Sequence, residues 1–193
     1  MQGRASAAWL RRAGLFVVAI AVSSVLNYGL YTVAGAQRGA PFTFRLPDLD
    51  GHLVDAADLR GKIVLVNIFA TWCPPCAKEM PALQTLANTY REQGLVVVGI
   101  ALDRPGLMGL ATNLDLRTHL RRFVADLHVT YPILMADQAI TMQDGQMVVE
   151  QWGGVPGIPM TYILDRDGVV VHTIIGYRKR AIFEQAVQRV LAR

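Results

Sequence analysis

Residues 63–81 decide the fold, and they read IVLVNIFATWCPPCAKEMP. Both cysteines of the chain, Cys73 and Cys76, lie in this stretch with two residues between them. The apolar, largely β-branched run Ile63–Phe69 predicts a strand that is buried on both faces, and the residues after Cys73 predict a helix. A thiol at a helix N-terminus faces the positive end of the macrodipole, which favours its thiolate. The stretch therefore predicts a dithiol/disulfide couple at a strand-to-helix junction.

The composition allows one domain of ordinary size with an appendage. The chain has 193 residues, of which 52% are apolar, and a net charge of +4. Arg4, Arg11 and Arg12 supply three of the positive charges ahead of the first acidic residue, Asp48, and the remainder is nearly neutral. A nucleic-acid partner would require Lys and Arg clustered on one face of the domain, so we expect none.

An uncharged segment follows the N-terminal arginines. A helix over residues 13–36 would be about 36 Å long, against about 30 Å of membrane hydrocarbon. The preceding arginines orient such a helix with its N-terminus in the cytoplasm. Ala34, Gly35 and Ala36 also fit a small-x-small cleavage site, so a cleaved signal peptide is the alternative. The expected organisation is a cytoplasmic N-terminus (1–12), a transmembrane signal anchor in the inner (cytoplasmic) membrane (13–36), a linker (37–41) and a domain on the periplasmic or extracytoplasmic side (42–193).

Periodic patterns in the exported domain predict an α/β sandwich with a central mixed sheet. The last two strands are joined by residues 165–168, which is short enough for an antiparallel hairpin. Residues 104–117 receive no assignment, and residues 141–152 fit either a hairpin or an interrupted helix. The expected strands are 42–46, 53–54, 63–69, 95–102, 133–135, 160–164 and 169–175, and the expected helices are 76–91, 118–129 and a final one with Phe183, Ala186, Val187, Val190 and Leu191 on one face.

Three stretches together resemble one family. TWCPPCAKEMP after VLVNIFA, GIPMTYILD at 157–165 and FRLPDLDG at 44–51 resemble the membrane-anchored thioredoxin-like proteins of the TlpA/ResA type, which include reductases of cytochrome c maturation. The resemblance covers about residues 41–193. It implies a thioredoxin-like three-layer sandwich with N-terminal extra strands and a central insertion. It also implies a thiol-disulfide oxidoreductase that uses a redox-active Cys73–Cys76 disulfide and no other cofactor.

The resemblance and the topology also suggest partners. Substrates would be cysteine-containing proteins, with apocytochrome c among the candidates. A domain outside the membrane cannot be reached by soluble cytosolic reductants, so a membrane electron donor would have to re-reduce it.

The cysteine pair has two purely structural interpretations. A disulfide closing so small a loop would add little stability. A zinc site needs about four ligands, and the chain offers only four histidines besides the two cysteines, none spaced as a ligand pair. These histidines are His52, His119, His128 and His172.

Two other functions remain as alternatives. A thiol peroxidase of the peroxiredoxin type needs a Thr three residues before its reactive cysteine and a Pro four before that Thr. Here Thr71 lies two before Cys73, and Asn67 occupies the proline's place. A copper-delivery module on a similar fold separates its cysteines by three residues and adds a histidine, for which His172 is the candidate.

We assign the attack to Cys73, which lies nearer the helix N-terminus and, by resemblance, carries the more exposed sulfur. Cys76 is the resolving thiol. Pro74 and Pro75 remove two backbone N–H donors that would otherwise stabilise a Cys73 thiolate. We therefore expect a reducing or moderate couple rather than a strong oxidant.

Glu79 is the predicted proton-handling residue. The resemblance places an acidic residue three positions after the second cysteine, close to the pair, and at i+3 Glu79 shares a helical face with Cys76. Thioredoxin itself has a buried aspartate six residues before its first cysteine, but here that position is Asn67, which cannot titrate. The alternative is an ordinary acid in the first turn of a helix.

Substrate contacts are predicted around a second motif. By resemblance, Ile158–Pro159 is a cis peptide facing the cysteines, and its neighbouring backbone pairs with an extended substrate segment. Pro156 is the rival position. Trp72 would shield the sulfur and offer an apolar contact, or else be a half-buried aromatic. The expected substrate-binding residues are Trp72, Pro74, Pro75, Ile158 and Pro159.

Overall fold

The structure is a computed structural model, and it describes residues 39–143, 146–149 and 153–193. The predicted cytoplasmic N-terminus, the anchor at 13–36 and the first two linker residues lie outside the described residues. Within the described ranges, no helix combines the length and the apolar character that crossing a membrane requires.

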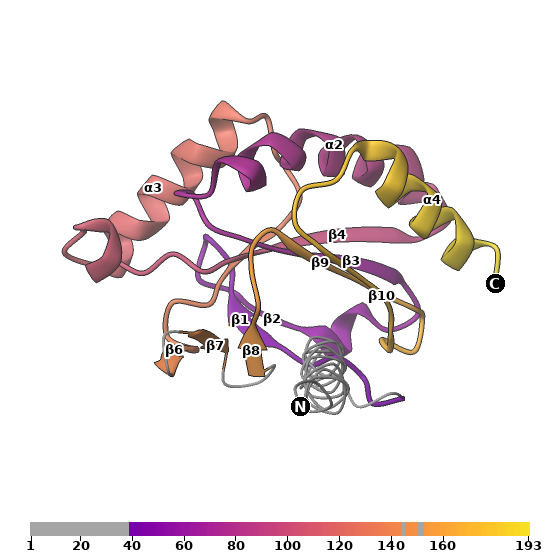
Figure 1. Cartoon of the computed structure of the whole chain (residues 1–193), viewed down its shortest axis with the longest axis horizontal. Coiled ribbons are helices and arrows are strands. Elements are labelled where there is room, and N and C mark those ends of the chain that lie inside the picture. Colours follow the sequence, from indigo (N-terminus) through magenta and orange to yellow (C-terminus); the bar gives the residue numbers. More distant parts are fainter. Residues whose placement is uncertain (1–38, 144–145, 150–152) are drawn as a thin grey trace, which may run out of the picture. The chain divides into compact units, whose positions relative to one another are not determined.

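A five-stranded mixed sheet lies at the centre of the domain, with the order β10-β9-β3-β4-β5 (Figure 1). Strands β3, β4 and β5 are parallel, whereas β9 runs antiparallel to both β3 and β10. The mixed sheet and the final hairpin are therefore confirmed. The strands are β3 (Ile63–Phe69), β4 (Leu95–Ala101), β5 (Ile133–Met135), β9 (Met160–Leu164) and β10 (Val170–Ile175).

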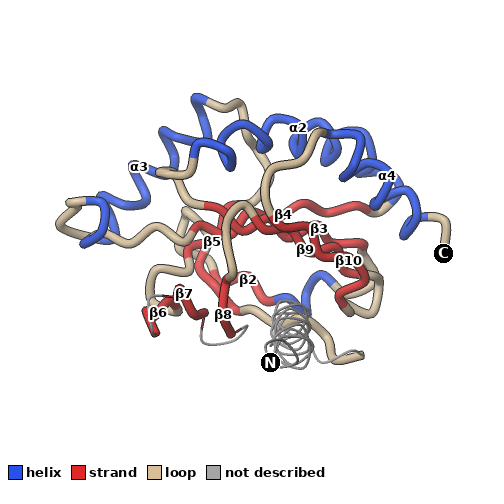
Figure 2. The backbone as a smooth tube through the Cα atoms, viewed as in Figure 1, coloured by secondary structure: helices blue, strands red, loops and turns tan. Residues whose placement is uncertain are grey.

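Helices α2 (Pro74–Tyr90), α3 (Asn113–Asp126) and α4 (Arg180–Leu191) lie on one side of this sheet (Figure 2). All three contribute to one buried cluster with the sheet residues that face them. Because side chains alternate along a strand, Ile63, Leu65 and Phe69 of β3 belong to this cluster, while Val64, Val66 and Ile68 belong to the cluster on the opposite face. Asn67 has the parity of the helix-facing set.

The opposite face is covered by the N-terminal segment. Strands β1 (Arg45–Pro47) and β2 (Leu53–Asp55) pair antiparallel, and the 3₁₀ helix η1 (Ala56–Leu59) follows. The extra N-terminal strands are thus confirmed, but the expected strand at 42–46 is wrong in its bounds. The Phe44 carbonyl accepts the N–H of Ala56, and the Phe42 N–H donates to the carbonyl of Gly168. These bonds fix the segment before β1 without making it part of a strand.

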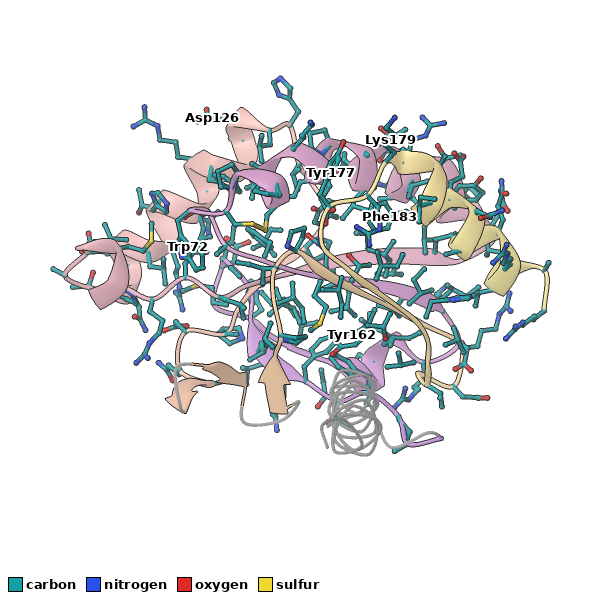
Figure 3. All side chains as sticks on the ribbon, in the orientation of Figure 1. Trp72, Asp126, Tyr162, Tyr177, Lys179 and Phe183 are labelled. Atoms are coloured by element: carbon teal, nitrogen blue, oxygen red, sulfur yellow. A yellow bond between two sulfur atoms is a disulfide. The ribbon has the colours of Figure 1, made fainter. Side chains whose placement is uncertain are left out.

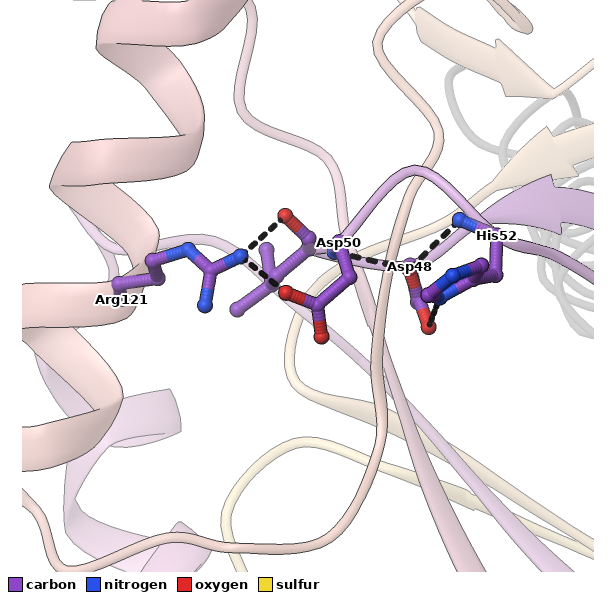
Figure 4. Close-up of polar contacts among 5 residues, drawn as sticks. Asp48, Asp50, His52 and Arg121 are labelled. Carbon is purple, nitrogen blue, oxygen red and sulfur yellow. Dashed lines mark hydrogen bonds and ion pairs between the residues drawn. The ribbon is translucent and has the colours of Figure 1, made fainter.

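A turn between β1 and β2 is fastened to α3 (Figure 4). The Arg121 guanidinium donates to the Leu49 carbonyl and to the Asp50 carboxylate. This contact holds the pKa of the exposed Asp50 carboxyl below its ordinary range. The turn itself is closed by Asp48, whose carboxylate accepts the backbone N–H groups of Asp50 and His52.

The unassigned residues 104–117 include the start of α3. A short 3₁₀ helix, η3 (Gly106–Met108), lies in the segment left unassigned, and α3 begins at Asn113 rather than at 118. The reason is a capping box in which the Thr112 hydroxyl accepts the Asp115 N–H and the Asp115 carboxylate accepts the Thr112 N–H. The helix ends at Asp126 rather than at 129, and His128 then adopts a left-handed φ of 53°.

The described residues of the ambiguous segment 141–152 lie in strands. β6 (Ile140–Gln143) and β7 (Gln146–Val149) make an antiparallel hairpin, and β8 (Gly153–Val155) pairs with β7. The interrupted-helix interpretation is therefore wrong. The end predicted for α2 is confirmed, because the 3₁₀ helix η2 (Arg91–Gln93) follows Tyr90 and Gly94 reverses the chain with a φ of 91°.

Candidate active site

Cys73 and Cys76 form a disulfide at the N-terminus of α2, with their Cα atoms 5.3 Å apart. Figure 3 shows the sulfur–sulfur bond at this end of the helix, near Trp72. Cys73 is the N-cap residue, and its Sγ accepts the backbone N–H of Cys76 at 3.3 Å. The two helix residues between them, Pro74 and Pro75, have no N–H to donate. The first turn therefore directs one backbone donor at the Cys73 sulfur.

The two cysteines differ slightly in their exposure to solvent. Cys73 is 5% exposed and Cys76 is fully buried. Around them, Trp72 is 49% exposed, and Pro74 and Pro75 are also exposed. A partner can approach from the side on which these three residues lie. The geometry is compatible with attack by Cys73, which stays a prediction, as does substrate contact by Trp72, Pro74 and Pro75.

Glu79 lies beneath the cysteine pair as a buried carboxyl, only 1% exposed. Burial raises its pKa from 4.5 to about 7, although the Arg178 backbone N–H and the Asn67 side chain act to lower it. Asn67 Nδ2 donates to Glu79 Oε1 at 2.9 Å. A carboxyl that titrates near neutrality is suited to accept and release a proton, so the ordinary-acid alternative does not describe its environment. Its exchange with Cys76 remains a prediction.

Asn67 also connects this carboxyl to the second motif. Its Nδ2 donates to the Thr161 hydroxyl at 3.1 Å as well as to Glu79. Thr161 is in β9, two residues after Pro159. The sequence marks Asn67 only as a residue that cannot titrate, whereas the structure shows that its amide is a donor between strand and helix.

The Ile158–Pro159 peptide is cis, as the resemblance implied. Pro159 is buried and Ile158 is half-buried, and Ile158 packs against the cluster that contains both cysteines. The Pro159 carbonyl already accepts the Gly176 N–H at 2.7 Å. An added substrate strand would therefore have to use the backbone before Pro159. Substrate binding at this position stays a prediction.

Two further residues near the cysteines, Asp103 and His119, were not predicted from the sequence. Asp103 lies two residues after the end of β4 and is 1% exposed, and its carboxylate accepts hydrogen bonds from Thr71. His119 Nε2 lies 3.0 Å from the Thr71 hydroxyl. An acid shortly after a buried parallel strand was a usable signal, because the carboxyl ends of neighbouring parallel strands meet at one edge of a sheet.

The possible metal ligands do not converge on the cysteines. Among the described residues, the side chains that could jointly hold an ion are Asp48, Asp50 and His52, on the turn of Figure 4. His172, the candidate third ligand for copper, pairs with Ile163, whereas the β9 residue nearest Pro159 pairs with Ile175. Burial and the positive charges of Arg189 and Arg193 lower the His172 pKa. This histidine therefore lies toward the C-terminal end of α4.

Comparison with known proteins agrees with this site. A family model described as Redoxin matches residues 35–190. The chain is 28% identical over 181 residues to the thiol-disulfide oxidoreductase ResA of Bacillus thuringiensis (strain Al Hakam), covering 90% of this chain and 93% of that one. It is 27% identical over 188 residues to ResA of Halalkalibacterium halodurans, covering 94% of each.

Solved structures give the same fold. A putative thiol:disulfide interchange protein DsbE from Chlorobium tepidum superposes with a TM-score of 0.64 at 22% identity, covering 83% of this chain and 99% of that chain. A thioredoxin family protein from Chlorobium tepidum TLS gives 0.62 at 28% identity, with 82% and 99% covered. The thioredoxin-like α/β fold is confirmed.

Proposed function

Since this chain belongs to the redoxin family and is a thiol-disulfide oxidoreductase, we propose that it reduces disulfides of cysteine-containing proteins outside the cytoplasm. The observation that carries the proposal is the Cys73–Cys76 disulfide at the N-cap of α2, with the buried Glu79 carboxyl one turn further along the helix. The disulfide is the oxidised product of the reaction, and Glu79, whose pKa burial raises to about 7, follows Cys76 in the same helix.

The reaction proceeds in two exchanges. In the reduced protein, the Cys73 thiolate attacks one sulfur of a substrate disulfide, and the other substrate sulfur leaves as a thiolate. Cys76 then gives its proton to the Glu79 carboxylate and attacks Cys73, which releases the second substrate sulfur. Two electrons have passed to the substrate, and the Cys73–Cys76 disulfide has formed. Protons from Glu79 and from water neutralise the two substrate thiolates.

The first turn of α2 supports this direction of electron flow. Because Pro74 and Pro75 supply no N–H, the Cys76 N–H is the donor that the structure shows at the Cys73 sulfur. A weakly stabilised thiolate makes the reduced form less favourable and the couple more reducing. Equilibration with glutathione buffers tests this direction. A potential near −120 mV, that of a strong oxidant, would contradict it.

The compartment and the partners belong to the same proposal. An N-terminal anchor at 13–36 would hold the domain at the outer side of the inner membrane, on the periplasmic side, and a membrane electron donor would restore the dithiol. The resemblance to reductases of cytochrome c maturation makes apocytochrome c a candidate substrate. The arginines before the uncharged segment support this orientation.

The experiment is to trap the mixed disulfide in vivo. Cys76→Ser in the full chain removes the resolving thiol, so a substrate protein should stay bound to Cys73 and be released by reductant. The matched control, Cys73→Ser with Cys76→Ser, should trap nothing. A Cys76→Ser variant that traps no protein would contradict the proposal, and so would a reduced wild-type protein that binds copper stoichiometrically without reducing any disulfide.

A further inference from the structure

Both the backbone N–H and the hydroxyl of Thr71 are bonded to one buried carboxylate, that of Asp103. Its backbone N–H lies 3.1 Å from both Oδ1 and Oδ2 of Asp103, and its hydroxyl donates to Oδ1 at 2.6 Å. Asp103 is 1% exposed. Thr71 begins the turn in which the Cys73 N–H donates to the Ala70 carbonyl at 3.2 Å. Asp103 thus fixes the backbone from which the active-site cysteine extends.

His119 completes the arrangement from α3. A hydroxyl has one proton to donate, and Thr71 gives it to Asp103, so a lone pair of the Thr71 oxygen is left to accept. His119 Nε2 lies 3.0 Å from that oxygen, and in the tautomer with a proton on Nε2 it donates to this lone pair. The chain of hydrogen bonds runs from His119 through Thr71 to Asp103. It joins α3, the end of β3 and the end of β4 beside the cysteine pair.

The arrangement fits a charged carboxylate. Both oxygens of Asp103 lie 3.1 Å from the Thr71 N–H, and an ionised carboxylate accepts this bond and that of the hydroxyl, whereas a protonated acid would have to reverse the hydroxyl bond. Burial raises the Asp103 pKa, and the hydrogen bonds of Thr71 together with the nearby His119 act in the opposite direction. The cysteine turn therefore packs against a buried negative charge.

We propose that Asp103 and His119 are positioning residues of the cysteine couple: through Thr71 they hold the turn that presents Cys73, and the Asp103 charge makes the couple more reducing. The inference rests on the proposed function and deepens it. The carboxylate disfavours a second negative charge on the nearby Cys73 sulfur, so it destabilises the reduced, ionised form. The N–H of His119, directed at Thr71, partly offsets the charge.

The test uses Asp103→Asn in the full chain. We expect the equilibrium constant with glutathione to shift about tenfold toward the dithiol, which is about 30 mV for a two-electron couple. We also expect faster alkylation of Cys73 by iodoacetamide at pH 7. Asp126→Asn, at the exposed end of α3, removes the same charge from the surface and should change neither quantity. A folded Asp103→Asn that stays within twofold of wild type in both would overturn the proposal.

Changes at His119 and Thr71 test the coupling independently of whether Asp103→Asn folds. His119→Ala should shift the equilibrium two- to threefold in the opposite direction, and His119→Gln, which keeps an N–H donor, should restore it. In a Thr71→Val background, which has no hydroxyl, His119→Ala should have no effect. If His119→Ala shifted the glutathione equilibrium equally with and without the Thr71 hydroxyl, the proposed coupling of His119 through Thr71 would be refuted.

Both readouts need no substrate protein, which separates the two proposals. Should the wild type reduce no protein disulfide while Asp103→Asn still shifts the glutathione equilibrium, the proposed function fails and the positioning assignment stands. If the wild type does reduce protein disulfides but Asp103→Asn leaves the glutathione equilibrium unchanged, the positioning assignment fails and the proposed function stands.

Discussion

Replacing Glu79 with Gln should change how the stability of the protein depends on pH. The pKa of the folded carboxyl is about 7, against an ordinary value of 4.5. One pKa unit corresponds to about 1.36 kcal/mol, so ionising Glu79 costs the folded state about 3 kcal/mol more than the unfolded state. Gln keeps the shape and an acceptor for Asn67 but carries no charge. The variant therefore avoids this cost.

The sign follows from proton uptake. Between pH 4.5 and about 7 the folded protein keeps the Glu79 proton that the unfolded chain has released. Stability from this group is thus intact below about pH 4.5, falls as pH rises, and is lost completely just above pH 7. Relative to wild type, Glu79→Gln should gain about 3 kcal/mol between pH 4.5 and pH 8.

The assay is urea unfolding of the oxidised protein at both pH values, compared between variant and wild type. Comparing the pH-dependent difference removes contributions from every other group. Glu92→Gln, an exposed carboxyl in η2, is the matched control and should show no pH-dependent gain. A gain below about 1 kcal/mol for Glu79→Gln would show that its carboxyl titrates as an ordinary one, and the reasoning from burial would be refuted.

Three further predictions concern contacts that hold the domain together. Gly99→Ala should destabilise the protein by about 1–3 kcal/mol, because its Cβ would lie 2.6 Å from Ile133 Cδ1 and 3.1 Å from the Phe69 ring; urea unfolding measures this, and an unchanged midpoint would contradict it. Asn67→Leu removes the donor to Glu79 Oε1, so the pH window of lost stability should move upward, and a downward move would show that Asn67 does not lower the Glu79 pKa. Tyr90→Phe removes the hydroxyl that donates to Glu184 at 3.0 Å and accepts from Gln188 at 2.7 Å; the loss should be about 1 kcal/mol by thermal unfolding, and a more stable variant would contradict this link between α2 and α4.

The sequence allowed the centre of the fold to be predicted because its signals are local. The run Ile63–Phe69 predicted a strand buried on both faces, and the cysteine pair after it predicted the start of a helix. From that junction, the family resemblance and the i+3 helical spacing together placed Glu79 close to Cys76. Its raised pKa could not be derived this way, since it depends on burial by neighbouring elements and on the amide of Asn67 from β3.

Two other predictions from the sequence were wrong in their bounds, each for a physical reason. Phe42, Phe44 and Leu46 alternate like a strand and are buried, yet backbone bonds of the first two are with Gly168 and Ala56 rather than with a neighbouring strand. The start of α3 was signalled by Thr112 and Asp115, a capping box that the Gly- and Leu-rich surroundings obscured.

The arrangement of Asp103 and His119 is a tertiary feature. Asp103 lies 32 residues after Thr71, and His119 lies 48 residues after it. They come together because β4 lies beside β3 in parallel and α3 packs on the same face of the sheet as α2. The acid after β4 is a local signal for a position at one edge of the sheet. Which residues meet it there depends on the order of the strands and the packing of α3.

The central claim is that Cys73 attacks and Cys76 resolves, and one measurement tests it most directly. Reduced Cys76→Ser and reduced Cys73→Ser are each incubated with a disulfide-linked peptide, and the covalent adduct is counted by mass spectrometry. Cys76→Ser should form one mixed disulfide per chain at Cys73, because this residue is the N-cap of α2 and the less buried of the two, and Cys73→Ser should form little because Cys76 is fully buried. An adduct that forms faster on Cys76 than on Cys73 would contradict the account.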